Sequence, residues 1–105
     1  MQKVGENLVI GDSGKAYHMN IYTKDTQFND FIAGVYIISE VTHSGERYIF
    51  LDETNNIYPL LKNHPKQRLL DEENYNRISF HMNASRQVRE AIVKDLLSAL
   101  DPVIS

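Results

Sequence analysis

The stretch Gly-Val-Tyr-Ile-Ile-Ser-Glu at 34–40, followed by Arg-Tyr-Ile-Phe-Leu at 47–51, decides the fold. Both segments are rich in β-branched and aromatic residues and carry apolar side chains at consecutive positions. That pattern is typical of strands buried on both faces. The segment Thr-His-Ser-Gly at 42–45 favours a turn between them. We therefore expect the two strands to pair antiparallel.

Three further segments also predict strands. Residues 7–10 and 15–22 flank the sequence Gly-Asp-Ser-Gly at 11–14, whose glycines supply the backbone freedom that a hairpin turn needs. Apolar residues occupy alternate positions of 77–82, which is the period of an amphipathic strand. The sequence thus predicts an N-terminal hairpin and one more strand late in the chain.

Apolar residues at helical spacing predict two short helices in the middle of the chain. Asn56 can cap the first of them, because its side chain can accept a hydrogen bond from a free amide of the first turn. Pro65 ends that helix by about His64, since the residue before a proline disfavours helical geometry. Residues 69–73 favour the second short helix.

The clearest helix is the last element of the chain. It runs from Ser85 to Leu100, and Pro102 closes it. Either Asn83 or Ser85 can cap its start. Its apolar stripe consists of Val88, Ile92, Leu96 and Leu100, and it is widened by Ala91, Val93, Leu97 and Ala99.

These elements predict an α+β fold, in which helices flank a small, mainly three-stranded antiparallel sheet that carries an extra N-terminal hairpin. The length of 105 residues and a hydrophobic content of 42% suffice for one core. We expect one globular domain overall, with residues 1–33 as an extension packed on a domain formed by residues 34–105.

Composition excludes several classes of function. The net charge of −3 argues weakly against a dedicated nucleic-acid binder, which usually carries a strongly basic face. The chain has no cysteine, which excludes disulfides, a thiolate zinc site and a cysteine nucleophile, and suits a reducing compartment. No apolar run is long enough for a membrane span, and the polar N-terminus does not resemble a signal peptide. We expect a cytoplasmic, soluble protein.

Several short motifs resemble known binding sites but lack the spacing that those sites need. Residues 11–15 resemble a phosphate loop, but two residues rather than four separate the glycines, and Ala16 follows the lysine. The four histidines show no paired spacing for a metal, and the acidic run at 71–73 is typical of a solvated surface. We therefore expect no metal site.

One set of residues resembles the GIY-YIG nuclease superfamily. In that family a Gly-Ile/Val-Tyr strand pairs with a Tyr-Ile-Gly strand, and a loop similar to Glu-Thr-Asn-Asn-Leu leads into a helix that ends near a histidine. Residues 50–57, together with Leu61, follow that order without a gap, and 95–102 is similar to the closing helix. The matching motif positions are Gly34, Val35, Tyr36, Phe50, Leu51, Asp52, Asn56 and His64.

The same resemblance implies that the catalytic groups of the family are missing. The tyrosine that helps to activate water matches Phe50, which has no hydroxyl. The helix arginine that steadies the phosphate matches Leu60, and the glutamate that holds the divalent metal falls at Val93. Asp52 replaces the glycine of the motif and puts a carboxylate where a phosphate would approach. The resemblance therefore implies an inactive member of the family.

We expect a non-catalytic binding module that needs no cofactor and binds a protein partner or a second copy of itself. The alternative is a divergent endonuclease or a DNA-binding protein with a rearranged site, which would use Mg or Mn if catalytic. Candidates for the vacated roles are Arg47, Tyr48, Tyr58 and Glu90. The possible phosphate contacts are Lys62, Lys66, Arg68, Arg86 and Arg89. Acidic residues outnumber basic ones over 34–105, which favours a protein partner.

Overall fold

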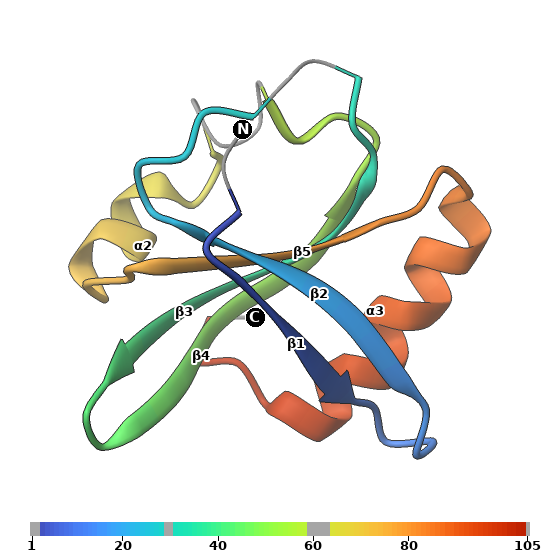
Figure 1. The fold of residues 1–105 in the computed structure, drawn as a ribbon, viewed down its shortest axis with the longest axis horizontal. Coiled ribbons are helices and arrows are strands. Elements are labelled where there is room, and N and C mark those ends of the chain that lie inside the picture. The colour runs from blue at the N-terminus through green and yellow to red at the C-terminus, as the bar shows by residue number, and fades with distance from the viewer. Residues whose placement is uncertain (1–2, 29–30, 59–63, 105) are drawn as a thin grey trace.

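A five-stranded antiparallel sheet forms the centre of the fold in a computed structural model, which describes residues 3–28, 31–58 and 64–104 (Figure 1). Its strands lie in the order β1-β2-β5-β3-β4. Their bounds are β1 Gly5–Ile10, β2 Ala16–Thr23, β3 Gly34–Thr42, β4 Gly45–Thr54 and β5 Arg77–Met82. In the described ranges the helices are α2, Gln67–Glu72, and the long α3, Arg86–Leu100, and residues 57–58 are also helical. The predicted α+β class and antiparallel sheet are confirmed.

The prediction of a mainly three-stranded sheet is wrong, because the N-terminal hairpin belongs to the same sheet. β2 pairs antiparallel with β5, with Asn20 opposite Phe80 and Tyr22 opposite Ile78. Tyr22 of β2 is buried in the cluster on one face of the sheet, and Met19 of β2 is buried in the cluster on the other. The local sequence pattern shows that β2 is a strand, but it does not show which distant strand β2 pairs with.

Both predicted hairpin turns are present. The turn between β1 and β2 spans residues 11–15 and contains Gly14 at φ +87°. β3 and β4 are joined through His43 and Ser44, and Gly45 then lies at φ +132°. Glycine adopts such positive φ angles without the steric cost that a side chain brings.

The sheet separates two hydrophobic clusters, because successive side chains of a strand point to opposite faces. On one face Tyr36 and Ile38 of β3 pack with residues that include Leu70 of α2. On the other face Val35 and Ile37 pack against α3. Figure 1 shows α2 and α3 on opposite sides of the sheet.

Ser85, one of the two predicted candidates, caps α3. Its Oγ accepts a hydrogen bond from the backbone amide of Val88 at 3.3 Å, and Asn83 Oδ1 accepts one from the amide of Ser85 itself. The helix ends at Asp101, which adopts the left-handed conformation and donates its amide to the carbonyl of Leu97.

The chain after α3 runs along the outer edge of the sheet. The amides of Val103 and Ile104 donate to the carbonyls of Tyr48 and Ile49 in β4, at 3.2 and 2.8 Å. This segment covers part of the β4 edge, next to the irregularity that interrupts the β3–β4 register after Ile38. β1, at the other end of the strand order, pairs only with β2 in the described part of the chain.

The two short helices agree with the sequence prediction where the structure describes them. The side-chain oxygen of Asn56 accepts hydrogen bonds from the amides of Tyr58 and Phe31, so Asn56 caps the helical turn at 57–58. The remainder of that predicted helix, at 59–63, lies outside the described residues. α2 begins two residues earlier than predicted. Neither α2 nor α3 is long and apolar enough to cross a membrane.

Candidate functional site

Three residues of the motif, Tyr36, Phe50 and His64, meet in a buried aromatic cluster. Tyr36 on β3 is 1% exposed and Phe50 on β4 is 6% exposed, and their ring centres lie 6.1 Å apart. The His64 ring stands edge-on to both, with its centre 5.9 Å from that of Tyr36 and 5.1 Å from that of Phe50. The fold therefore brings together residues that are up to 28 positions apart in the sequence.

Hydrogen bonds around His64 assign its tautomer. The backbone amide of Lys66 donates to Nδ1 of His64 at 3.0 Å, so Nδ1 carries no hydrogen. The neutral ring must then be protonated at Nε2, which donates to the hydroxyl of Tyr36 at 2.8 Å. Burial lowers the pKa of His64 and raises the pKa of Tyr36, so the imidazole stays neutral and the phenol stays protonated near neutral pH.

A small pocket of about 140 Å³ adjoins this cluster. Its other walls come from residues 52–54 at the end of β4 and from Pro65 and Lys66. Asp52 is exposed there, and its carboxylate accepts a hydrogen bond from the backbone amide of Glu53 at 2.8 Å. The charges of Asp52 and Glu53 add to the rise of the Tyr36 pKa, after burial. The pocket therefore has two acidic residues in its lining.

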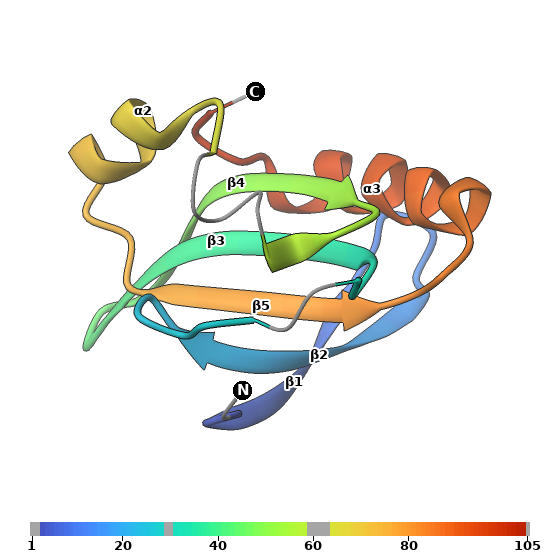
Figure 2. The same cartoon turned by 90° about the horizontal axis from the view of Figure 1, so that it is seen from above.

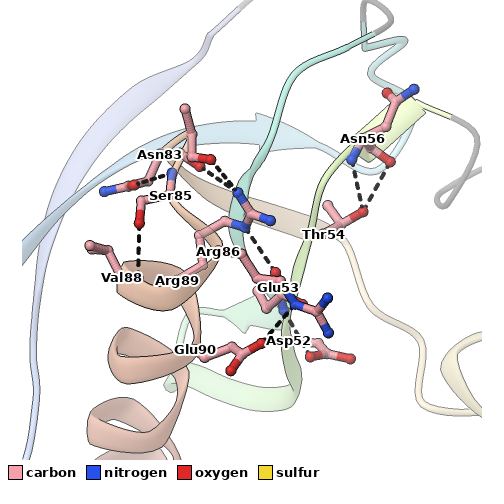
Figure 3. Close-up of polar contacts among 11 residues, drawn as sticks. Asp52, Glu53, Thr54, Asn56, Asn83, Ser85, Arg86, Val88, Arg89 and Glu90 are labelled. Carbon is pink, nitrogen blue, oxygen red and sulfur yellow. Dashed lines mark hydrogen bonds and ion pairs between the residues drawn. The ribbon is translucent and has the colours of Figure 1, made fainter.

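Arg89 ties the start of α3 to the end of β4, as Figure 3 shows. It is 3% exposed, and its Nε donates to Oε1 of Glu53 at 2.8 Å. Its Nη1 donates to the backbone carbonyls of Asn83 and Ala84, at 3.1 and 3.0 Å. These contacts engage the guanidinium within the protein, so Arg89 holds two elements together.

The other basic residues named as phosphate contacts do not form one surface. Arg86 lies on the exposed face of α3 and pairs with Glu90 at 2.8 Å. Arg68 pairs with Glu72 on α2 at 3.7 Å, and Lys66 borders the small pocket. The remaining candidate, Lys62, lies outside the described residues.

The positions that match the family's catalytic residues do not converge. Val93 packs with the cluster between α3 and the sheet, together with Leu51 and Val35. Phe50 belongs to the cluster on the opposite face. Leu60 lies outside the described residues. In the described part of the chain, the tyrosine and glutamate positions of the family are therefore separated by the sheet.

The residues considered for a rearranged site are also dispersed. Tyr48 packs against the α3 side, and Arg47 pairs with Glu40 and Glu73 at 3.0 and 2.8 Å. Tyr58 borders a separate pocket of about 310 Å³. Within the described residues, no group of three or more histidine, aspartate and glutamate side chains could hold a metal ion.

Gly34 lies where β3 comes close to β5. A Cβ at Gly34 would lie 2.2 Å from the carbonyl oxygen of His81 and 2.6 Å from the ring of Phe80. This is far closer than van der Waals contact, and the carbonyl belongs to a backbone that cannot easily move. The glycine therefore permits close approach of β3 and β5.

Sequence reasoning missed a polar cluster centred on Asp95. This carboxylate of α3 accepts the amide and the hydroxyl of Ser13, at 2.8 and 2.7 Å, and the hydroxyl of Tyr17 at 2.7 Å. These hydrogen bonds hold the pKa of Asp95 below its usual value, with Ser13 as the largest cause. They fasten the β1–β2 turn to α3. More than 75 positions separate the partners, so no local spacing could have indicated the contact.

No protein family, curated protein or solved structure matches this chain. The resemblance to the GIY-YIG superfamily rests on the motif residues alone.

Proposed function

We propose that this protein is a non-catalytic binding module on a GIY-YIG-like fold, and that its partner is a protein rather than a nucleic acid. The observation that carries the proposal is the environment of Phe50. Its ring lacks a hydroxyl and packs against Tyr36 and His64 in the core. A water molecule could not be activated there by the group that the family uses.

The arrangement of β3 and β4 agrees with this proposal. β3, which carries the Gly-Val-Tyr motif, lies between β4 and β5, and β4 carries the second motif. Tyr36 and Phe50 point to the same face of the sheet. Both rings pack against the His64 ring, and the Tyr36 hydroxyl is hydrogen-bonded to it.

Charge and apolar exposure favour a protein partner. Asp52 and Glu53 lie beside the pocket, while the basic side chains of Arg86 and Arg89 are paired with Glu90 and Glu53. Phosphate contacts dominate nucleic-acid affinity, and this distribution offers few of them. The large exposed apolar side chains include Val4, Leu8, Ile10 and Met82, which suit contact with another protein.

The second candidate is a divergent Mg- or Mn-dependent endonuclease or a DNA-binding protein with a rearranged site. One observation favours it: Tyr36 and Asp52, which are paired across β3 and β4, both line the small pocket. The Tyr36 phenol is protonated, and the Asp52 carboxylate is a group that can bind a divalent cation.

Fluorescence anisotropy with a labelled short duplex, measured at about 50 and 200 mM salt, separates the two candidates. We expect no saturable binding at micromolar protein concentrations. A micromolar Kd that weakens steeply with salt would contradict the choice of a protein partner. In that case Arg86→Gln, which changes an exposed cation, and Arg68→Gln on the other helix would show which surface meets the phosphates.

A further inference from the structure

An open groove lies between the first turns of α3 and the adjoining ends of β2 and β5. Its volume is about 520 Å³, within the range of roughly 300–1,000 Å³ that is typical of small-molecule sites. In Figure 2, β5 leads directly into α3, and β2 is the neighbour of β5. Tyr17 of β2, which lines the groove, packs with the cluster on the α3 face of the sheet. The groove is therefore on the opposite face from Tyr36 and Phe50.

The apolar stripe of α3 continues into this groove. Ile92, on the stripe, is 5% exposed, whereas Val88, one turn earlier, is 44% exposed. α3 packs mainly on β4 and β3, and the groove separates its first turns from β2 and β5. Val88 and Ala91 therefore form an aliphatic wall that stays accessible from the groove.

Two rings line the strand side of the groove, and hydrogen bonds hold both of them. The hydroxyl of Tyr17 donates to Asp95 at 2.7 Å, and Nδ1 of His81 donates to the backbone carbonyl of His18 at 2.9 Å. The rings of Tyr17 and His81 meet edge to face, with their centres 6.3 Å apart. Walls that are already fixed lower the entropic cost of binding, and ring surfaces suit contact with a further aromatic ring.

Lys15 supplies positive charge at this groove. Its side chain is exposed, and it forms no ion pair with any carboxylate in the described part of the chain. The charge of Asp95 acts on Lys15, but that carboxylate lies outside the lining and accepts its hydrogen bonds from Ser13 and Tyr17. The Lys15 ammonium is therefore available to an anion in the groove.

Two side-chain amides add hydrogen-bond donors. The Oδ1 atom of Asn83 accepts the amide of Ser85 at 3.0 Å, which leaves the NH₂ group of Asn83 without a partner among the described residues. Gln87, exposed on the first turn of α3, also lines the groove. No aspartate or glutamate does so in the described ranges. The polar part of the groove is therefore complementary to a negatively charged group.

We propose that this groove binds a small aromatic carboxylate. The ring of the ligand lies between Val88 and the rings of Tyr17 and His81. Its carboxylate lies at Lys15, because one ammonium balances the single charge of a carboxylate, and the nearby amides donate to its oxygens. This inference goes beyond the proposed function, since the ligand is a small molecule and the groove is separate from the buried aromatic cluster.

An NMR titration of the isotope-labelled protein with naphthylacetate tests the site. We expect saturable shifts at the amides of Tyr17, His81 and Val88, with a Kd of about 1 mM or tighter. Naphthylacetamide is the matched control ligand, because it has the same ring without the charge, and it should bind about threefold more weakly. Lys15→Met should weaken the binding of naphthylacetate by a similar factor and leave that of naphthylacetamide unchanged.

A pair of alanine substitutions on α3 tests the place of binding. Ala91→Phe puts a ring into the groove and should weaken naphthylacetate binding at least about tenfold. Ala99→Phe is the matched control, because Ala99 is exposed on the same helix and does not line the groove. It should leave the Kd unchanged. Circular dichroism shows whether each variant keeps the fold.

Several results would overturn the site. Naphthylacetate could cause no shift at about 10 mM, ten times the expected Kd, or could shift only residues away from the groove. Ala91→Phe could bind as tightly as the unmodified protein. Equal binding of naphthylacetate and naphthylacetamide would refute the choice of a carboxylate. None of these results bears on binding to a protein partner or to duplex DNA, so the proposed function is tested separately.

Discussion

Replacing Arg89 by methionine removes the guanidinium that joins α3 to β4. Arg89 is 3% exposed and supplies hydrogen bonds to the Glu53 carboxylate and to the carbonyls of Asn83 and Ala84. Methionine replaces much of the side-chain volume without supplying a donor. The substitution therefore leaves one carboxylate and two carbonyls without this partner.

The expected loss of stability follows from the burial of the pair. Removing one partner of a buried ion pair costs about 3–5 kcal/mol. The Glu53 side chain is 22% exposed, so water can partly solvate its carboxylate once the guanidinium is removed. We therefore expect the lower end, about 3 kcal/mol, which corresponds to a fall in Tm of about 12 °C for a chain of this size.

Urea unfolding followed by circular dichroism measures this loss, and Arg86→Met on the same helix is the matched control. The Arg86 side chain is 79% exposed, and its partner Glu90 is 57% exposed. An exposed pair of this kind contributes less than about 0.5 kcal/mol. Equal effects of the two substitutions, or a loss below about 1 kcal/mol for Arg89→Met, would refute the structural role assigned to Arg89.

Three further substitutions have defined outcomes. Gly34→Ala should lower the free energy of unfolding by at least about 2 kcal/mol in the same urea experiment, because the added Cβ meets the carbonyl of His81. Asp95→Asn should speed amide hydrogen exchange at Ser13, measured by NMR, since the ionised acceptor is weakened; unchanged exchange would contradict the contact. Burial lowers the pKa of His64, so the stabilisation from its neutral form is complete above its ordinary value of 6.5 and is lost as pH falls below it. His64→Gln should flatten the dependence of the urea midpoint on pH between about 7 and 5.

The secondary structure could be predicted from local patterns because each element repeats its signal within a few residues. The β3–β4 hairpin and α3 are the clearest examples, and the cap at Ser85 follows from the same local chemistry. The number of strands in the sheet could not be predicted in this way, because the pairing of β2 with β5 joins segments about 57 positions apart. Nothing in either strand alone identifies its partner.

The candidate site, too, could be predicted only in part from the sequence. The motif indicated that Tyr36, Phe50 and His64 belong together, and they form one cluster. Val93 lies on the other face of the sheet from Phe50, because α3 covers that face. The apolar pattern of α3 does not reveal which face the helix covers. The sequence also does not reveal the structural contact of Arg89: in the sequence it is one of several cations, and in the fold it pairs with Glu53.

A plasmid-nicking assay tests the absence of nuclease chemistry most directly. Supercoiled plasmid is incubated with the purified protein in Mg²⁺ or Mn²⁺, with chelator as the blank. We expect no nicking above the blank, for the unmodified protein and for Phe50→Tyr, because the hydroxyl alone does not restore the charge that Leu60 and Val93 lack. Metal-dependent nicking by the unmodified protein that disappears in Glu90→Gln or Tyr58→Phe would contradict the proposal that this fold serves binding alone.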